Sequence, residues 1–493
     1  MIKQSNHRAF GSRIAQSGVT LMFSAVLSAC ANYAGIHSDK EMAQPQSYAT
    51  QQSLPANDGR WPAPDWADQF GDAQLRALLD EALAGSPTLE QARARIAAAS
   101  AYSETARANT MPQVGASYSW TRQRYSENAL VPPPYAGSWQ SENKALLSAS
   151  YDLDLWGKNR EALKAAISQV QASRADAEAV RLALDTSIAR TYNQLARLYA
   201  LRDIAQNEVD EREKIVRITA GRIANGLDNE VERKTADADL ASSRATLSAL
   251  DGGIVATRYQ IAALLGKGPD RGLSIARPQL GIGDEVRLPA NLPADLVSRR
   301  PDIVAARWRV DAMTHDIKEA KAEFYPDINL SATLGLDAFG FGRFLTAASR
   351  TMSAGPAIHL PIFDGGALRA QLKGRYADFD YAVATYNQTL VTALSDVATD
   401  LSQIRSTDAQ LVDANTAQDA AQSAQQLALT QYRAGLANQL TVLNAETNAL
   451  AAERSVANLK MDRRDQQIAL AAALGGGYTD TSADTSSDAL AAR

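Results

Sequence analysis

The chain contains few of the residues that build metal sites, disulfides or aromatic cores. Among its 493 residues there is a single cysteine, Cys30, and there are four histidines, His7, His37, His315 and His359. One cysteine excludes an intramolecular disulfide, and so few cysteines and histidines argue against a zinc site. Aromatic residues make up only 6% of the chain, and the formal net charge of −5 is unlike that of a nucleic-acid-binding protein. We therefore expect no metal, no other cofactor and no nucleic-acid partner.

The N-terminus has the layout of a secretory signal peptide. Residues 1–29 carry three basic residues, Lys3, Arg8 and Arg13, without any acidic residue. An apolar run over residues 19–27 follows, which is too short to span a bilayer and ends in small residues. The sequence thus predicts that the mature protein begins after residue 29.

The end of this leader resembles the bacterial lipobox. Leu27-Ser28-Ala29-Cys30 has the pattern in which the cysteine becomes the first residue of the mature protein and carries a covalent lipid. The alternative is that Cys30 is simply a small apolar residue of the leader. Ala31 and Asn32 follow in place of the aspartate that commonly retains such lipoproteins in the inner membrane, so the resemblance implies the outer membrane.

The chain contains an internal repeat. Residues 86–96 align with residues 300–310 at an offset of 214, and residues 225–227 align with residues 434–436 at an offset of 209. A unit of about 210 residues is too long for a solenoid repeat, so the pattern indicates a duplicated protomer. The predicted order is a signal peptide (1–29), a lipid-anchored N-terminal segment (30–86), a first repeat (87–266), a linker (267–300), a second repeat (301–475) and a disordered tail (476–493).

Each repeat is expected to hold a short helix, a β-hairpin and a long helix pair. The predicted hairpins occupy residues 113–156 and 327–363. In residues 114–121, 147–155 and 328–337 apolar residues alternate with Gly, Ser, Thr, Asn or Asp, whereas the fourth segment, 354–362, is weaker and contains Pro356 and Pro361. This alternation fits a transmembrane β-barrel with a wet interior or an ordinary half-buried sheet, and the leader favours the barrel.

Four strands cannot close a barrel, and open strand edges are not tolerated in lipid. The chain must therefore oligomerise. Two copies would give eight strands and a filled interior, whereas three copies would give twelve strands and a water-filled lumen. A homotrimer would therefore make a pore.

Two long stretches are free of proline and end at a glycine. Residues 157–225 would form a helix about 100 Å long at 1.5 Å per residue, and residues 363–434 form a matching stretch. Apolar residues at heptad spacing, with others off that seam, favour a cylinder of helices, although a solid bundle is the alternative. Gly226 and Gly435 are suited to ending the two helices in a tight turn.

Three segments carry a resemblance to a known family. They are Trp-Ala-Asp-Gln-Phe-Gly-Asp-Ala-Gln-Leu at 66–75, Leu-Pro-Ala-Asp-Leu-Val-Ser-Arg-Arg-Pro-Asp-Ile at 292–303 and Tyr-Arg-Ala-Gly-Leu-Ala-Asn at 432–438. On these segments the chain resembles the TolC-like outer-membrane factors, in the lipoprotein branch that serves tripartite (RND-type) multidrug efflux systems. The resemblance implies a mainly helical trimer, with a twelve-stranded β-barrel in the outer membrane joined to a twelve-helix α-barrel in the periplasm. It also implies a girdle of short helices and a passive exit duct for drugs or other small molecules.

The resemblance also implies functional positions at the helix turns. The contacts with a periplasmic adaptor, which couples to an inner-membrane pump, would be Arg222, Gly226 and Leu227 in the first copy and Arg433, Gly435 and Leu436 in the second. The periplasmic gate would be Leu440 and Asn444, with asparagine in place of the usual aspartate. Charge at that level could come from Glu446 or Glu232, each equally well interpreted as a solvated surface residue.

Two other classes of protein remain as alternatives. A structural coiled-coil lipoprotein of the outer membrane would explain the heptads and the anchor, but not the duplicated hairpins. A lipoprotein hydrolase would need a Ser/His/Asp set, and the histidines beyond the leader are scattered. No phosphate-binding loop and no catalytic group are apparent in the sequence, so we expect that the protein binds no nucleotide and is not an enzyme.

Overall fold

The computed structural model describes residues 33–55, 59–128, 131–226, 228–281, 283, 288–289 and 292–480. The predicted signal peptide, Cys30 and Leu227 lie outside the described residues. The chain divides into two compact units. The first comprises the described parts of Met1–Met42, Ile96–Ser173 and Ala306–Tyr386, and the second those of Ala43–Arg95, Arg174–Ala305 and Asn387–Arg493.

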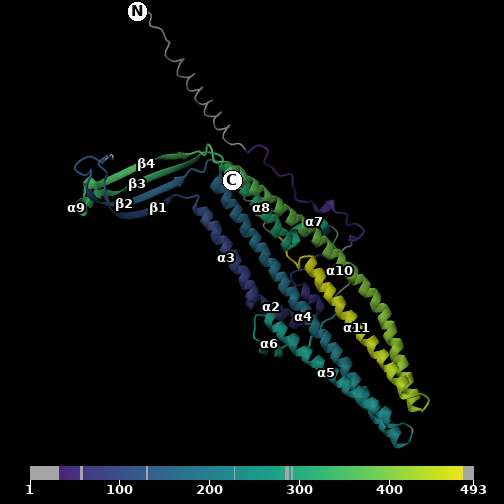
Figure 1. Cartoon of the computed structure of the whole chain (residues 1–493). Helices are drawn as coiled ribbons and strands as arrows, with labels where there is room; N and C mark the ends of the chain where they lie inside the picture. Colours follow the sequence, from purple (N-terminus) through teal and green to yellow (C-terminus); the bar gives the residue numbers. More distant parts are fainter. Residues whose placement is uncertain are drawn as a thin grey trace, which may run out of the picture. The chain divides into compact units, whose positions relative to one another are not determined.

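The first unit contains one antiparallel sheet in the order β1-β2-β3-β4 (Figure 1). The strands are β1 (Gln113–Arg124), β2 (Trp139–Asp152), β3 (Asp327–Phe339) and β4 (Arg350–His359). Short helices α9 (Phe341–Phe344) and η3 (Ala347–Ser349) lie in the connection between β3 and β4. The two repeats therefore join their hairpins edge to edge through β2 and β3.

Strand boundaries differ from the sequence prediction in two places. The fourth strand begins at Arg350 and ends at His359, whereas we expected it over 354–362. Pro356 is accommodated because β4 is an edge strand, where a missing N–H breaks no ladder on the open side. The first hairpin ends at Asp152, so Leu153 and Leu155, which we placed in the alternating pattern, follow the strand.

The helices of the two repeats match in length. Helices α3 (Pro87–Ala108) and α8 (Pro301–Ala322) each have 22 residues. Helices α4 (Lys158–Ala224) and α10 (Ala367–Arg433) each have 67, and α5 (Glu230–Leu264) and α11 (Gln439–Ala473) each have 35. The five-residue difference in repeat offset therefore lies within the hairpins, which confirms the duplication read from the sequence.

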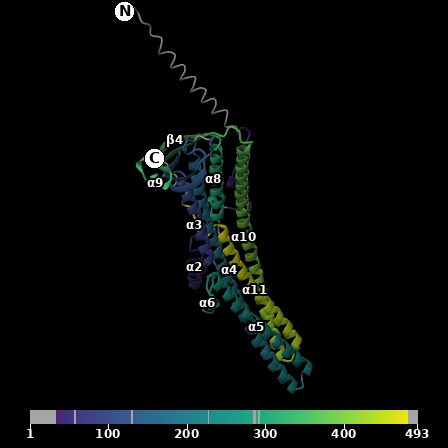
Figure 2. The same cartoon turned by 60° about the vertical axis from the view of Figure 1, so that its left-hand side comes forward.

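The second unit contains the parts of the long helices that lead to the turns, together with several short elements. These are η1 (Pro45–Ser47), η2 (Trp66–Phe70), α2 (Ala73–Gly85), α6 (Pro269–Leu273) and α7 (Leu292–Arg299). Figures 1 and 2 show α6 beside α5, and α11 beside α10. One core holds Trp66, Phe70, Leu75, Tyr192 and Ile261, all buried.

A second core contains apolar residues of the segment 292–303, one of the three that carried the family resemblance. Leu292 and Leu296 of α7 are buried against Val397 and Leu401 of α10. Leu292 and Leu296 of the segment 292–303 are therefore packing positions between α7 and α10.

The ordered chain continues beyond residue 476, where the sequence predicted a disordered tail. The backbone N–H of Asp480 donates to the carbonyl oxygen of Ser298 at 2.9 Å. A Cβ on Gly477 would lie 2.4 Å from the backbone nitrogen of Pro64. Residues 476–480 thus pack in the second unit, because the glycines allow a close approach to neighbouring backbone.

None of the described helices is both long enough and apolar enough to cross a bilayer.

Candidate functional site

The sheet of the first unit has two chemically different faces. The register places Val114 opposite Ala149, Ala149 opposite Ala332, and Ala332 opposite Ala354, so these side chains share one face. That apolar face carries Val114, Ala116, Tyr118 and Trp120 on β1, Ala145, Leu147, Ala149 and Tyr151 on β2, Ile328, Leu330, Ala332, Leu334 and Leu336 on β3, and Met352, Ala354, Pro356 and Ile358 on β4. The opposite, polar face carries Gly115, Ser117, Ser119 and Thr121, Ser148 and Ser150, Ser331 and Thr333, and Thr351 and Ser353.

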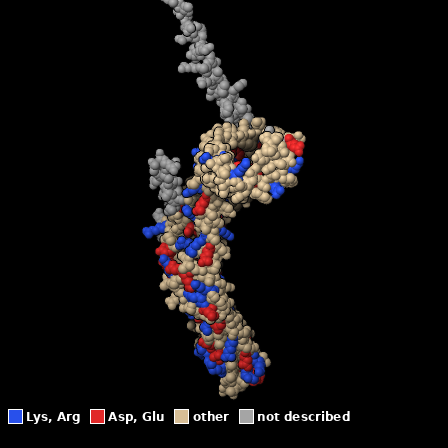
Figure 3. Space-filling view, turned by 90° about the vertical axis from the view of Figure 1, so that its left-hand side faces the viewer, with Lys and Arg blue, Asp and Glu red and all other residues tan. Residues whose placement is uncertain are grey.

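Charged side chains lie on the polar face. Lys144 and Asp337 are opposite each other in the register, and Lys144 Nζ lies 3.6 Å from Asp337 Oδ2. Figure 3 faces this end of the sheet and shows a hollow in which basic and acidic atoms are visible. A face of small hydroxyl groups with paired charges suits contact with water, whereas large apolar residues such as Leu147, Leu334 and Met352 are exposed on the other face.

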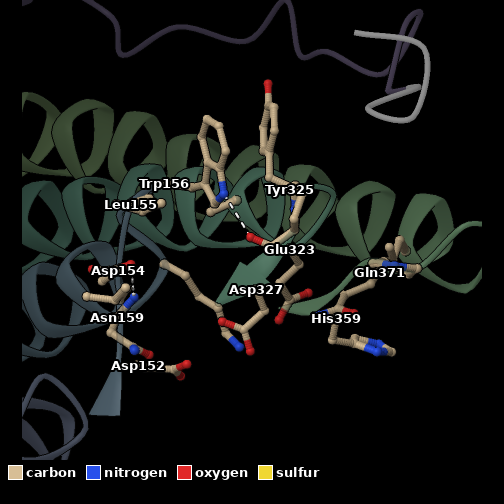
Figure 4. A pocket seen from close by; sticks show the side chains of 16 residues that line it. Asp152, Asp154, Leu155, Trp156, Asn159, Glu323, Tyr325, Asp327, His359 and Gln371 are labelled. Atoms are coloured by element: carbon tan, nitrogen blue, oxygen red, sulfur yellow. Dashed lines mark hydrogen bonds between the residues drawn. The ribbon is translucent and has the colours of Figure 1, made fainter. Parts of the chain in front are cut away.

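A cavity of about 350 Å³ lies where the strands meet the helices. The ring of Trp156 stacks on that of Tyr325, with centroids 4.7 Å apart, and Trp156 Nε1 donates to the carbonyl oxygen of Pro326 at 2.9 Å. Figure 4 shows these two rings on one side of the chain, and the carboxylates of Asp152 and Asp327 with the imidazole of His359 on the other. Apolar and polar side chains are therefore separated at the base of the sheet too, with the two aromatic rings on one side and the two carboxylates and the imidazole on the other.

The turns between the long helices lie in the second unit. Gly226 follows α4 with φ of +74°, and Gly435 follows α10 with φ of +77°. This left-handed conformation favours glycine and ends a helix. The structure thus gives both glycines the conformation expected of them at the turns.

A three-residue contact joins the two turns. Arg222 Nε donates to Asp228 Oδ2 at 2.7 Å, and Arg222 Nη2 donates to Asp228 Oδ1 at 3.1 Å. Tyr432 donates its hydroxyl proton to Asp228 Oδ2 at 3.2 Å, and the Arg222 guanidinium lies 4.6 Å from the Tyr432 ring centroid. The hydrogen bond to Asp228 raises the pKa of Arg222, and burial raises the pKa of Tyr432. We name Arg222, Asp228 and Tyr432 the turn clasp.

No local sequence pattern predicted the turn clasp. Arg222 was expected on a surface for a partner, but its guanidinium faces Asp228 and Tyr432, and its side chain is only 20% exposed. Arg433 and Leu436 are exposed, and Leu436 is 80% exposed. The only sequence signal for the clasp was the position of Tyr432 in the segment 432–438.

The two predicted gate residues lie on one exposed side of α11. Leu440 is 61% exposed, and Asn444 is exposed one helical turn later. Gln439, Val442 and Glu446 are buried on the other side of the same helix. Leu440 and Asn444 are thus available to a neighbouring molecule.

Glu446 is not the solvated surface residue that the sequence allowed. It is 1% exposed, and its Oε2 lies 3.4 Å from Nη1 of Arg212. Neither carboxylate oxygen accepts a hydrogen bond from another described residue. Burial raises the pKa of Glu446 to about 7, although the charge of Arg212 opposes this shift. Glu232 instead closes the start of α5, where its Oε2 accepts from the backbone N–H of Asn229 at 3.2 Å.

The histidines of the described chain do not assemble a hydrolase triad. His315 Nδ1 lies 2.5 Å from Glu161 Oε2, and its Nε2 lies 3.7 Å from Asp311 Oδ2. The nearby Ser168 hydroxyl donates to Asp311 Oδ2 at 2.5 Å, so it donates to a carboxylate rather than to an imidazole. His37 pairs with Asp39, and His359 lines the cavity in Figure 4. In the described ranges no group of three or more His, Cys, Asp or Glu residues could hold a metal ion.

Comparison with known proteins gives consistent matches. The family described as outer membrane efflux protein matches residues 78–267 and 292–476. Multidrug resistance outer membrane protein MdtP of Escherichia coli strain K12 is 31% identical over 465 residues, which cover 92% of this chain and 94% of that protein. Fusaric acid resistance protein FusA of Burkholderia cepacia is 39% identical over 320 residues, 64% of this chain and 60% of FusA.

A solved structure agrees with these matches. The outer membrane protein VceC of Vibrio cholerae aligns with a TM-score of 0.79 and 37% identity, covering 85% of this chain and 100% of VceC. The family resemblance and the mainly helical fold with a membrane sheet that we expected from the sequence are confirmed. Because the family match covers both repeats, and so most of the chain, this protein belongs to the outer membrane efflux protein family.

Proposed function

We propose that three copies of this chain form a passive exit duct through the outer membrane, as the outer component of a tripartite efflux pump for drugs or other small molecules. The sheet is the observation that carries this proposal. It has an apolar face, a polar face and two edge strands, β1 and β4. In lipid those edges must be paired, and three copies would pair them in a closed barrel of twelve strands. Twelve strands leave an aqueous lumen, which the polar face would line.

The helices support the same assembly. Large apolar side chains on the second-unit part of α10 stay exposed in the single chain, with Val412 67% and Leu427 63% exposed. Neighbouring copies would cover such residues in a cylinder of twelve helices, four from each copy. Burial of these side chains between neighbouring copies would stabilise such a cylinder.

The position of the N-terminal segment supports a lipid anchor at Cys30. Tyr33 packs edge-on against Phe324 with centroids 5.6 Å apart, and its hydroxyl lies 3.3 Å from the Tyr325 hydroxyl. Ile36 is buried beside Leu372. Three residue steps span at most about 11 Å, so a lipid on Cys30 would enter the bilayer close to these aromatic rings. Cys30→Ser should lose incorporation of labelled palmitate, whereas Ser38→Ala, which keeps Cys30, should incorporate it as the parent does.

The turns are the proposed contact with a periplasmic adaptor. Arg433, Gly435 and Leu436 of the second copy, with Gly226 and Leu227 of the first, would meet the adaptor, which couples to an inner-membrane pump. Arg222 would join this surface once it leaves Asp228. The exposure of Leu436, at 80%, supports a role in binding a partner.

Leu440 and Asn444 are the proposed periplasmic gate. Three copies would bring these exposed residues together around the axis at the level of the turns. The turn clasp would hold the helix pairs in the closed state, and opening would break it. Because asparagine is neutral, this ring would lack the carboxylates usual in the family.

A crosslinking experiment tests the adaptor contact. A photo-crosslinking residue replaces Leu436 in living cells, and mass spectrometry identifies the captured protein. We expect a periplasmic adaptor at Leu436 and none at Tyr102, which is 74% exposed on α3 and serves as the control. Failure to capture an adaptor, with a trimer present in the outer membrane, would contradict the assignment of the turns. A structural coiled-coil lipoprotein would in addition show no conductance in a planar bilayer.

A further inference from the structure

Two connections at one end of the sheet fold onto opposite faces. The connection between β1 and β2 runs from residue 125 to 138, of which 129 and 130 lie outside the described residues, and the one between β3 and β4 contains α9 (Figure 1). In the second connection, Phe344 packs against Tyr118 of the apolar face, with ring centroids 6.0 Å apart. In the first connection, the rings lie on the polar face.

The placement on the polar face follows from the strand register. Phe339 is opposite Glu142 in the register. On the same face, the neighbouring pair toward the helices is Lys144 and Asp337. Tyr125 donates its hydroxyl proton to Glu142 Oε2 at 2.8 Å. The ring of Tyr125 lies 5.3 Å from that of Phe339, and the ring of Tyr135 lies 5.0 Å from it. We name Tyr125, Tyr135 and Phe339 the exit cluster.

Backbone contacts hold the exit cluster in place. Tyr125 N–H donates to Ser138 O at 3.1 Å, and Gly137 N–H donates to Tyr125 O at 3.0 Å. The Ser138 hydroxyl donates to Tyr135 O at 2.7 Å. Gly137 has φ of +74°, and a Cβ there would lie 2.6 Å from Glu127 Oε1, so the turn needs glycine. These hydrogen bonds hold the described part of the first connection in one conformation, with its two tyrosine rings over the polar face of the sheet.

The exit cluster contrasts with the rest of the polar face. Serine, threonine and glycine are the commonest residues on that face, and the large apolar Leu146 packs across Gly335, whose Cβ position would lie 2.8 Å from Leu146 Cδ2. The residue opposite Phe339 in the register is Glu142 rather than glycine, and the rings of Tyr125 and Tyr135 pack against that of Phe339. Three rings that pack together on a wet face protect one another from water and together occupy more of the lumen than serine does.

We propose that the exit cluster is a fixed aromatic constriction near the outer mouth of the duct, which sets the size limit for molecules that pass it. This inference rests on the proposed function, because the polar face must line the duct. The cluster lies at the outer end, since the other ends of the strands continue into α3, α4, α8 and α10. Three copies would direct nine rings inward, with Glu142, Lys144 and Asp337 just below them. A ring of apolar groups above a charged layer restricts bulky polar molecules most.

Accessibility from outside the cell tests this proposal. Ser150→Cys places a thiol on the polar face below the exit cluster, and the parent chain, whose single cysteine is Cys30, reports the background. Intact cells are treated with a small impermeant maleimide or with a bulky polyethylene-glycol maleimide. Phe339→Ala and Tyr135→Ala should raise labelling by the bulky reagent roughly tenfold and leave labelling by the small one nearly unchanged, because pore diameter limits only the larger molecule.

Matched variants separate the cluster from general loosening of the sheet. Phe341→Ala removes an exposed ring of α9 in the other connection, and it should change neither rate. Tyr125→Phe keeps the ring but loses the hydrogen bond to Glu142, and the size limit should stay. All variants are checked as trimers on unheated gels, and if Phe339→Ala does not assemble, Tyr135→Ser outside the strands carries the test.

The outcomes distinguish the two proposals. The constriction is overturned if the ring variants leave labelling by the bulky reagent unchanged, or if Phe341→Ala raises that labelling as much as they do. In either case, labelling of Ser150→Cys by the small reagent would still support a duct. Absence of any labelling at Ser150→Cys, with the trimer in the outer membrane, overturns both, because the polar face would then not line a water-filled path.

Discussion

The hydroxyl of Tyr432 donates a hydrogen bond to the carboxylate of Asp228 at 3.2 Å, across 204 residues of sequence. Tyr432 lies in the last turn of α10, the long helix of the second repeat, and Asp228 lies in the turn of the first repeat. The same carboxylate accepts two hydrogen bonds from Arg222. The two repeats are thereby fastened to each other at the turns by one shared acceptor.

Tyr432→Phe should loosen this fastening while preserving the buried ring. The lost hydrogen bond contributes about 1 kcal/mol, which corresponds to a factor of about five in the balance between closed and open turns. We expect a higher mean conductance of the purified trimer in planar bilayers. Tyr102→Phe, at an exposed position of α3, is the matched control. Equal conductance of Tyr432→Phe and parent would show that the clasp does not restrain the turns.

Glu446 should make the turn region less stable as the pH rises. Its pKa of about 7 in the folded chain lies above the ordinary value of a glutamate, 4.5, so the folded state binds the proton more tightly. Stability is therefore greatest below the unfolded pKa and is lost as the pH rises through about 7, at up to about 1.4 kcal/mol per pH unit. The groups that act on Glu446 are Arg212, Glu208, Glu211 and Asp239.

Glu446→Gln should remove this dependence. The neutral amide has no ionisation to suppress, so the protease resistance of the turns should be nearly the same at pH 5 and pH 8, whereas the parent should be cleaved faster at pH 8. Glu232→Gln at the start of α5 keeps a side-chain acceptor for Asn229 and should retain the slope of the parent. A parent whose cleavage rate is flat across this range would refute the role of Glu446.

Asn444→Cys should connect neighbouring copies at the gate. Because the side chain is exposed on the same side of α11 as Leu440, oxidation should yield disulfide-linked chains and block efflux until a reductant is added. Gln439→Cys is the control. The side chain of Gln439 is only 6% exposed in the parent, so a cysteine at this position should not crosslink. Unaltered transport by the crosslinked protein would contradict a gate at this level.

Opposite faces of β2 should respond differently to a charge. Leu147→Arg places a guanidinium on the apolar face, where an arginine near the bilayer midplane costs about 2–4 kcal/mol. Ser148→Arg introduces the same residue on the polar face and should be tolerated, since water can reach it there. Urea unfolding of the reconstituted trimer measures both. Similar losses of stability in the two variants would mean that the faces are not lipid and water.

Much of this fold follows from local patterns. Alternation in residues 114–121 and 328–337 assigns the two faces of the sheet, because successive side chains of a strand point to opposite sides. The absence of proline between 157 and 225 and the glycines at 226 and 435 set the long helices and their turns. The duplication is visible as a constant offset. Each of these features depends on residues that are close in sequence or on similarity between two segments.

Other features required the tertiary structure. Glu446 is charged, so the sequence allowed a solvated surface position, and only the packing of α4 and α5 beside α11 shows that it is buried next to Arg212. The clasp of Arg222, Asp228 and Tyr432 joins residues from two repeats, which no local pattern brings together. Likewise, Phe339 ends its strand on the polar face, and only the fold of the first connection shows that two tyrosines cover it. The sequence by itself determined the order of the elements, the extent of the long helices and the faces of the sheet, because these depend on backbone periodicity. The three-dimensional packing decided which side chains meet, because burial and pairing arise only when distant segments are placed against each other.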